Sequence, residues 1–257
     1  MSDELPMNDV QCAVARVVER TVGHGKHCAR SAVAHICRAW RIQVVDPEMA
    51  AFRALTAEEE AATAIFHALK RLRYHGADRL GLRDHTHKAA VRPFFEAISE
   101  SFAKGGLNTY RPALIIDETG REPKLMTQLQ IPGPGGRPLF AYPQPPLHFS
   151  VNVNDRCHDF TEELDRACSV HNVNSMIEYI RTRGNRRNRL LYATAGGVPK
   201  ISCTPELFLL TERDITFQLL SVFLLIDLNP ERQGFVEQAV TAFLKMLGRL
   251  PTDLSES

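Results

Sequence analysis

The sequence predicts a predominantly helical α+β protein, with a helical first half and a mixed second half that contains short antiparallel hairpins. Apolar residues recur at helical spacing up to about residue 104, alternate with polar residues in short stretches after it, and dominate two long stretches near the C-terminus. We therefore expect a helical region at 1–108 and a mixed region at 109–257. The 257 residues correspond to about 1.7 domains of average size. This length fits two separate domains and also fits one composite fold.

The first two helices are expected to form a hairpin or a broken helix around Gly23-His24-Gly25. Apolar residues follow a helical stripe on both sides of this break: Val10, Val14, Val17 and Val18 before it, and Cys28, Val33, Ile36, Cys37 and Trp40 after it. A third helix is expected to begin at Asp46, because an aspartate can cap the helix and Pro47 at the first helical position loses no hydrogen bond.

Two more helix features are predicted before residue 104. Thr56-Ala57-Glu58-Glu59 matches a capping box, so we expect a helix to restart there. Its buried face would consist of Ala61, Ile65, Ala68, Leu69 and Leu72. In the next helix, which carries Val91 and Phe102, we expect Pro93 to cause a kink because it lacks the backbone N–H.

The second half begins with an expected strand pair at 112–117 and 124–131 around a turn at 117–120. Six prolines between residues 132 and 146 predict a loop without regular structure. A strand at 148–154, a helix at 160–180 and a hairpin at 190–203 are expected to follow. Two apolar helices close the chain, and the last is expected to be capped near Asn229-Pro230.

The composition excludes several classes of protein. A formal net charge of +1 argues against a strongly basic body that coats nucleic acid, and 44% hydrophobic residues argue against a disordered chain. The acidic N-terminus does not resemble a secretory signal, and the longest apolar run, 217–228, is too short to cross a membrane. The six cysteines form no CxxC pair. We expect a cytoplasmic protein with reduced thiols, no membrane contact and no cofactor.

The segment 79–88 contains the residues we select as catalytic candidates: Arg79, His85 and His87. Imidazoles can move protons near neutral pH, and a cation such as Arg79 or Lys88 can hold a phosphate, so these residue types suffice for metal-independent RNA cleavage. The alternative is a polar loop whose histidines only solvate or cap the start of a helix.

This segment also carries a family resemblance. Ala57-Glu58-Glu59-Glu60-Ala61-Ala62, followed by His85-Thr86-His87-Lys88 and an apolar helix, resembles the HEPN superfamily, in particular its AbiV-like abortive-infection proteins, over residues 47–104. Arg79 and His85, with five residues between them, match the spacing of the HEPN nuclease motif. The resemblance implies a homodimer that brings two Arg–His pairs together, RNA as substrate, no metal, and a role in a prokaryotic defence or toxin system. It also covers noncatalytic helical modules, so it leaves catalysis open.

An arginine-rich stretch is the candidate nucleic-acid contact. Arg181, Arg183, Arg186, Arg187 and Arg189 lie within nine residues. Arginine binds phosphate with a planar fork of donors, but arginines near a helix C-terminus can also simply offset the helix dipole.

Two alternatives complete the set of predictions. His24, Cys28 and His35 would share one face of a continuous helix and could bind zinc, although a cysteine on an apolar stripe more often serves packing. The chain could also be a noncatalytic adaptor that binds a partner protein through the proline-rich loop 132–146 and the arginine-rich stretch.

Overall fold

The computed structural model describes residues 4–104, 113–117, 124–148, 152–153, 156–157, 159–168, 177–183, 190 and 205–250. It confirms the predicted class, because helices dominate and a small antiparallel sheet accompanies them. No helix among the described residues is long and apolar enough to span a membrane. The hairpin predicted at 190–203 lies outside the described residues, except for Leu190.

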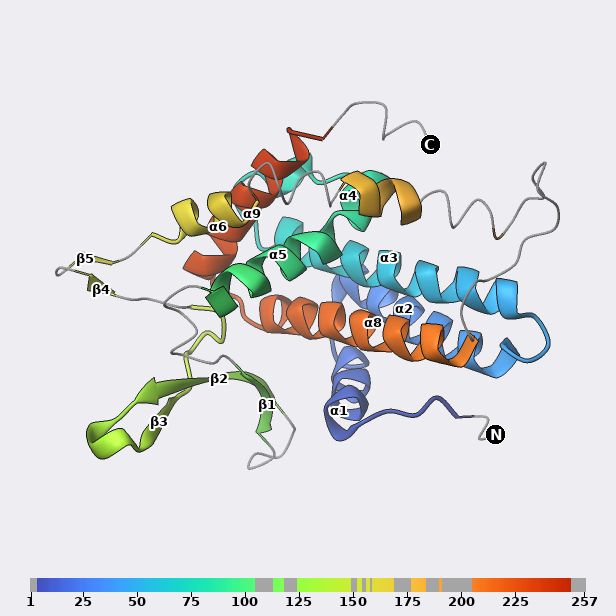
Figure 1. Cartoon of the computed structure of the whole chain (residues 1–257), viewed down its shortest axis with the longest axis horizontal. Coiled ribbons are helices and arrows are strands. Elements are labelled where there is room, and N and C mark those ends of the chain that lie inside the picture. The colour runs from blue at the N-terminus through green and yellow to red at the C-terminus, as the bar shows by residue number, and fades with distance from the viewer. Residues whose placement is uncertain are drawn as a thin grey trace.

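Three long helices form the centre of the molecule. These are α2 (Gly23–Ile42), α3 (Pro47–Arg71) and α8 (Pro205–Asp227), with α3 packed against both of the others. They run side by side along the long axis of the molecule (Figure 1). The shorter α1 (Asp9–Val18) crosses them and packs on α2 and α8. The predicted break before α2 is confirmed, because Gly23 has a positive φ of 74° that glycine tolerates without strain.

Shorter helices cover one end of this layer. They are the 3₁₀ turn η1 (Ala77–Arg79), α4 (His85–Ala89), α5 (Val91–Lys104), α6 (Thr161–Ala167) and α9 (Gly234–Leu247). Aromatic rings connect them to the centre: the rings of Phe94 and Phe243 meet edge to face with centroids 5.1 Å apart, and Phe243 also contacts Phe66 of α3. A further helical segment spans the described residues 177–183.

The sheet consists of β1 (Ala113–Asp117), β2 (Lys124–Pro132) and β3 (Pro138–Ala141) in the antiparallel order β1-β2-β3. The predicted pairing of β1 with β2 is confirmed, with Ile115 opposite Met126. A two-stranded ladder of β4 (Asn152–Val153) and β5 (Arg156–Cys157) follows. The larger sheet extends from the helical body at the lower left of Figure 1, and β2 contacts α8.

One connected core contains helices from both predicted regions. Ile36, Phe66, Leu220, Phe223 and Phe243 belong to the same cluster of buried apolar side chains, although the first two precede residue 108 and the last three follow it. The regions 1–108 and 109–257 therefore pack as one composite fold in their described parts.

Four local predictions were wrong. The last helix, α9, is not capped near Asn229-Pro230, because it begins at Gly234 with Gln233 at the N-cap position. Thr56 does not restart a helix, because α3 is continuous and the Thr56 hydroxyl donates to the carbonyl of Phe52 at 2.9 Å. Pro93 does not kink a helix interior, because α5 begins at Val91 and its first turn has few intrahelical N–H bonds to lose. The stretch 132–146 is not wholly irregular: the 3₁₀ turn η3 (Pro134–Gly136) lets β3 pair with β2.

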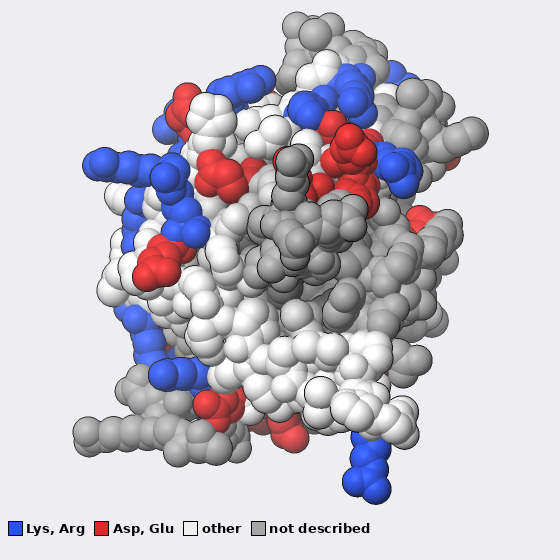
Figure 2. Space-filling view, turned by 90° about the vertical axis from the view of Figure 1, so that its left-hand side faces the viewer, with Lys and Arg blue, Asp and Glu red and all other residues white. Residues whose placement is uncertain are grey.

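Charge is dispersed among the described residues on the face shown in Figure 2. On the face shown in Figure 2, the Lys and Arg side chains of the described residues alternate with Asp and Glu side chains and do not merge into one basic field. The lower part of this face, at the height of β2 and β3, is largely uncharged. This distribution agrees with the near-zero formal charge of the chain.

Candidate functional site

Three consecutive glutamates in the middle of α3 organise the candidate site. Glu58, Glu59 and Glu60 are separated by about 100° each around the helix, so their side chains point in three directions. Glu58 is directed toward α8 and residues 177–183, Glu59 toward α4, and Glu60 toward α2. One turn of one helix thus carries three carboxylates into three different environments.

Glu59 joins two residues of the predicted catalytic segment. Its Oε2 lies 2.9 Å from Nδ1 of His85 and 3.6 Å from Nζ of Lys88. The Lys88 side chain is largely buried, whereas 50% of the His85 side chain is exposed to solvent. The carboxylate therefore orients an imidazole that solvent can reach, with an ammonium group beside it.

The start of α4 explains how His85 is held. Asp84 caps this helix, because its carboxylate accepts from the backbone N–H groups of Thr86 and His87 at 2.8 and 3.1 Å. His85 is the first residue of α4, where a cationic imidazole would oppose the helix dipole. The Glu59 carboxylate offsets this cost, because its negative charge lies next to the imidazole ring.

His87 contacts different groups from those that His85 contacts. Its Nδ1 accepts a hydrogen bond from the backbone N–H of Gly81 at 2.9 Å, and its Nε2 lies 3.4 Å from Oδ2 of Asp84. The loop must approach closely here, since a Cβ on Gly81 would lie only 2.6 Å from Cβ of Asp84. His87 thus holds the loop 81–87 closed, and both of its ring nitrogens face protein groups.

Glu60 forms the third environment, between α2 and α4. Its carboxylate accepts hydrogen bonds from the side chains of Ser31 and Cys28 and lies near Lys88. Burial raises the pKa of Glu60 above its ordinary value, and Lys88 only partly offsets this effect. Burial and the charge of Glu60 together raise the pKa of the Cys28 thiol to about 11.

Arg79 is not joined to these groups. Its side chain is exposed on η1, and no hydrogen bond or ion pair links it to another described residue. Within the described part of the chain, the predicted pair Arg79 and His85 is therefore not assembled in one copy. Glu59 contacts His85 instead, and the sequence does not reveal this pairing because Glu59 also fits a capping box.

The arginine-rich stretch divides into three cases. Arg181 is exposed in the helical segment 177–183. Arg183 is enclosed: its guanidinium binds Glu58 and donates to the two carboxylate oxygens of Glu212 at 2.9 and 2.5 Å. Arg186, Arg187 and Arg189 lie outside the described residues.

The three residues considered for zinc do not converge. The His24 ring stacks on His67 with centroids 5.7 Å apart, Cys28 is bonded to Glu60, and His35 lies 3.5 Å from the Arg53 guanidinium. Within the described ranges, no group of three His, Cys, Asp or Glu side chains could hold a metal ion.

The cluster of Glu59, His85 and Lys88 can perform acid–base chemistry on an anion. With Nδ1 bound to Glu59, proton transfer to a substrate falls to Nε2, and the carboxylate stabilises the imidazolium that forms. The Lys88 ammonium supplies a positive charge that an approaching phosphate would share with Glu59.

Comparisons with known proteins assign neither a family nor a function to this chain. No protein-family model matches the chain, and neither the curated proteins nor the solved structures contain a significant match. The resemblance to the HEPN superfamily therefore stays a prediction based on residues 47–104.

Proposed function

We propose that this chain is an RNA-directed protein of a prokaryotic defence or toxin system, and that it cleaves RNA without a metal at His85. The observation that carries the proposal is the 2.9 Å contact between Glu59 Oε2 and Nδ1 of a half-exposed histidine. A carboxylate bound to one ring nitrogen fixes the imidazole for proton transfer at the other.

In the proposed reaction, Nε2 of His85 takes the proton of a ribose 2′-hydroxyl while the oxygen attacks the adjacent phosphorus. The bond to the 5′-oxygen breaks, and that oxygen takes a proton from water or from His85 of a second copy. The products are a 2′,3′-cyclic phosphate and a 5′-hydroxyl. Lys88 stabilises the charge on the phosphoryl oxygens. Arg79 enters through the family resemblance alone, as a phosphate ligand in a homodimer.

The test is cleavage of a fluorescent single-stranded RNA in the presence of EDTA. We expect His85→Gln to lower the rate by about 10²-fold or more, the usual contribution of general acid–base catalysis. His75→Gln, at another exposed histidine, is the matched control and should cleave like the wild type. A 2′-deoxy substitution at the cleaved position should block the reaction. Equal rates for His85→Gln and the wild type, or inhibition by EDTA, would contradict the proposal.

A noncatalytic adaptor is the second candidate function, and one observation favours it. Leu139 and Phe140 on β3 are 53% and 52% exposed, within the proline-rich stretch predicted to bind a partner protein. Replacing both by serine should then release a protein that co-purifies with the wild type. Unchanged co-purification in this variant would contradict the adaptor.

A further inference from the structure

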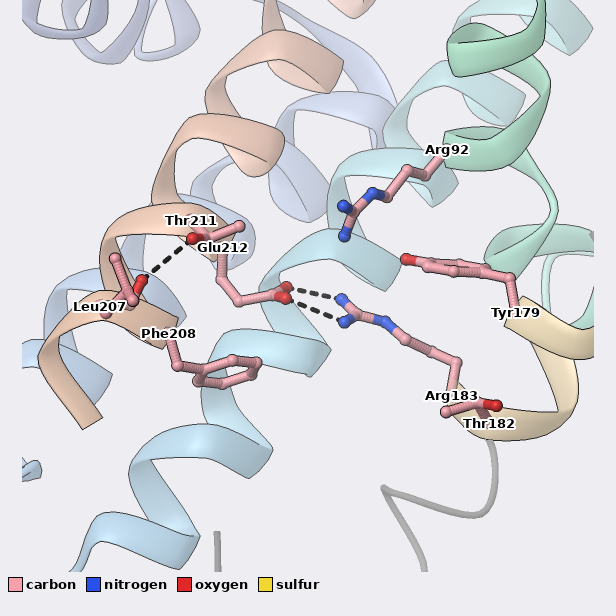
Figure 3. A pocket seen from close by; sticks show the side chains of 8 residues that line it. All are labelled: Arg92, Tyr179, Thr182, Arg183, Leu207, Phe208, Thr211 and Glu212. Atoms are coloured by element: carbon pink, nitrogen blue, oxygen red, sulfur yellow. Dashed lines mark hydrogen bonds and ion pairs between the residues drawn. The ribbon is translucent and has the colours of Figure 1, made fainter. Parts of the chain in front are cut away.

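A pocket of about 360 Å³ is lined by residues that take no part in the proposed reaction at His85. It is lined by side chains from α5, the segment 177–183 and α8, as Figure 3 shows: Arg92, Tyr179, Thr182, Arg183, Leu207, Phe208, Thr211 and Glu212. This volume lies within the range of sites for small molecules.

One wall of the pocket is rigid. The Arg183 guanidinium is held between Glu58 and Glu212, whose side chains are each only 3% exposed, and is itself 13% exposed. The Tyr179 hydroxyl donates to Glu58 Oε1 at 3.3 Å. Since every group in this wall is bonded to a neighbour, the wall offers a ligand fixed planar surfaces and no mobile charge.

The opposite wall contains a cation that can change partners. The Arg92 guanidinium lies 5.2 Å from the centre of the Tyr179 ring, and Figure 3 shows it directed into the pocket above that ring. Its Nε donates to Glu96 at 2.8 Å, but 59% of the Glu96 side chain is exposed. Arg92 also lies near Tyr179 and Glu212, so Glu96 is the partner most open to solvent, and an anionic ligand could replace Glu96 on Arg92.

The lining matches a ligand that is both planar and anionic. Phe208 presents an aromatic ring to the pocket. The guanidinium groups of Arg92 and Arg183 lie over the Tyr179 ring, 5.2 and 5.8 Å from its centre, and guanidinium planes themselves stack on heterocyclic bases. Thr182 and Thr211 add hydroxyl groups at the exposed side of the pocket, where sugar hydroxyls could bind. Base, ribose and phosphate together make a ribonucleotide.

The position of the pocket connects it to the candidate active site. Glu58, which contacts Tyr179 and Arg183, directly precedes Glu59, which contacts His85. Arg92 follows Lys88 by four residues, across the junction of α4 and α5. The pocket and the candidate active site are therefore linked through the same turn of α3 and through the junction of α4 and α5.

We propose that this pocket binds one ribonucleotide unit of a single-stranded RNA, with the base against Phe208 and the phosphate on Arg92. The choice of RNA over a free nucleotide rests on the proposed function, whereas the pocket itself can be tested without cleavage.

The experiment measures binding to the full-length His85→Gln variant, so that cleavage does not interfere. A fluorescent ten-nucleotide single-stranded RNA is followed by anisotropy, and ribonucleoside 5′-monophosphates by calorimetry. We expect Arg92→Gln and Phe208→Leu each to weaken RNA binding by about 5- to 150-fold, the range for loss of one stacked or phosphate contact. Arg38→Gln, at an exposed arginine on α2, is the control and should bind like the parent. Circular dichroism checks that each variant is folded.

The outcomes separate the pocket from the reaction. Unchanged RNA binding in folded Arg92→Gln and Phe208→Leu overturns the pocket, even if the wild type cleaves RNA. Binding of monophosphates with no binding of RNA overturns RNA as the ligand and assigns the pocket to a free nucleotide. RNA binding that depends on Arg92 supports the pocket even if no cleavage is found, in which case the proposed function alone fails.

Discussion

Glu58 and Glu59 are consecutive residues of α3, yet Glu58 binds Arg183 and Glu59 binds His85. The first contact fixes the side of α3 that faces α8, and the second fixes the side that faces α4. A rotation of α3 about its axis would break both contacts at once. The buried ion pair at Glu58 therefore holds the carboxylate of Glu59 in position against the imidazole.

The first prediction concerns this ion pair. We expect Arg183→Met to lower the free energy of unfolding by about 3–5 kcal/mol, because it leaves two buried carboxylates without a counter-ion. Urea unfolding at pH 7 measures the loss. Arg181→Met, at an exposed arginine in the same segment, is the control and should change stability by less than about 1 kcal/mol. A loss below 1 kcal/mol for Arg183→Met would show that the pair does not hold this interface.

The helices were predictable because their signals are local. The stripe ending at Val18, the glycine break at Gly23 and the cap at Asp46 all act within a few residues of the boundary that they set. Thr56 shows the limit of this reasoning. A capping box and a continuous helix contain the same residues, and the packing of α3 between α2 and α8 favours the continuous helix.

The candidate site was only half predictable. Residue type alone points to His85 and Lys88, but the carboxylate of Glu59 that contacts them lies 26 positions away from His85. Arg183 likewise lies 29 positions away from its partner Glu212. Local periodicity carries no information about which distant side chains meet. The run of three glutamates was a usable signal, since charged residues rarely occupy the middle of a buried helix unless they are paired.

The second prediction concerns the two helix starts that the sequence predicts, one at Asp46 and one at Thr56. Asp46→Ala should lower the free energy of unfolding by about 1 kcal/mol, because Asp46 accepts from the backbone N–H of Met49 at 2.9 Å. Thr56→Ala should cost less than about 0.5 kcal/mol, because Thr56 lies inside α3 and alanine has the higher helix propensity. Urea unfolding of both variants checks this order, and a larger loss for Thr56→Ala would argue for a helix start at Thr56.

The third prediction concerns Cys28. With its pKa raised to about 11, only about 10⁻³ of this thiol is ionised at pH 8, so iodoacetamide should modify it slowly. Glu60→Gln removes the negative charge that contributes to this shift and should speed the modification. Peptide mass spectrometry follows the reaction at Cys28. Glu48→Gln, in the first turn of the helix α3 that also carries Glu60, is the control and should leave the rate of Cys28 modification unchanged. Equal rates of Cys28 modification in Glu60→Gln and the wild type would contradict the contact between Glu60 and Cys28.

The fourth prediction is a pH dependence of stability at the end of α3. Asp227 is bound by Arg71, with Nη2 2.9 Å from Oδ1, and its side chain is 3% exposed. Burial raises the pKa of Asp227 even though Arg71 favours the charged form. Because the pKa is higher in the folded state, the unfolded chain releases this proton first. The contribution of Asp227 is thus greatest below its ordinary pKa of 3.8 and is lost as the pH rises through its folded-state pKa.

Asp227→Asn should remove this dependence. Between pH 4 and pH 7, the free energy of unfolding should therefore fall in the wild type relative to that of the variant. Urea unfolding of both proteins at one-unit steps measures the difference. Arg71→Gln provides the second readout: without the cation, the carboxylate should ionise at a still higher pH, and stability should fall more steeply with rising pH than in the wild type. Parallel pH profiles for the wild type and Asp227→Asn would mean that burial of this carboxylate does not control the stability of the α3–α8 contact.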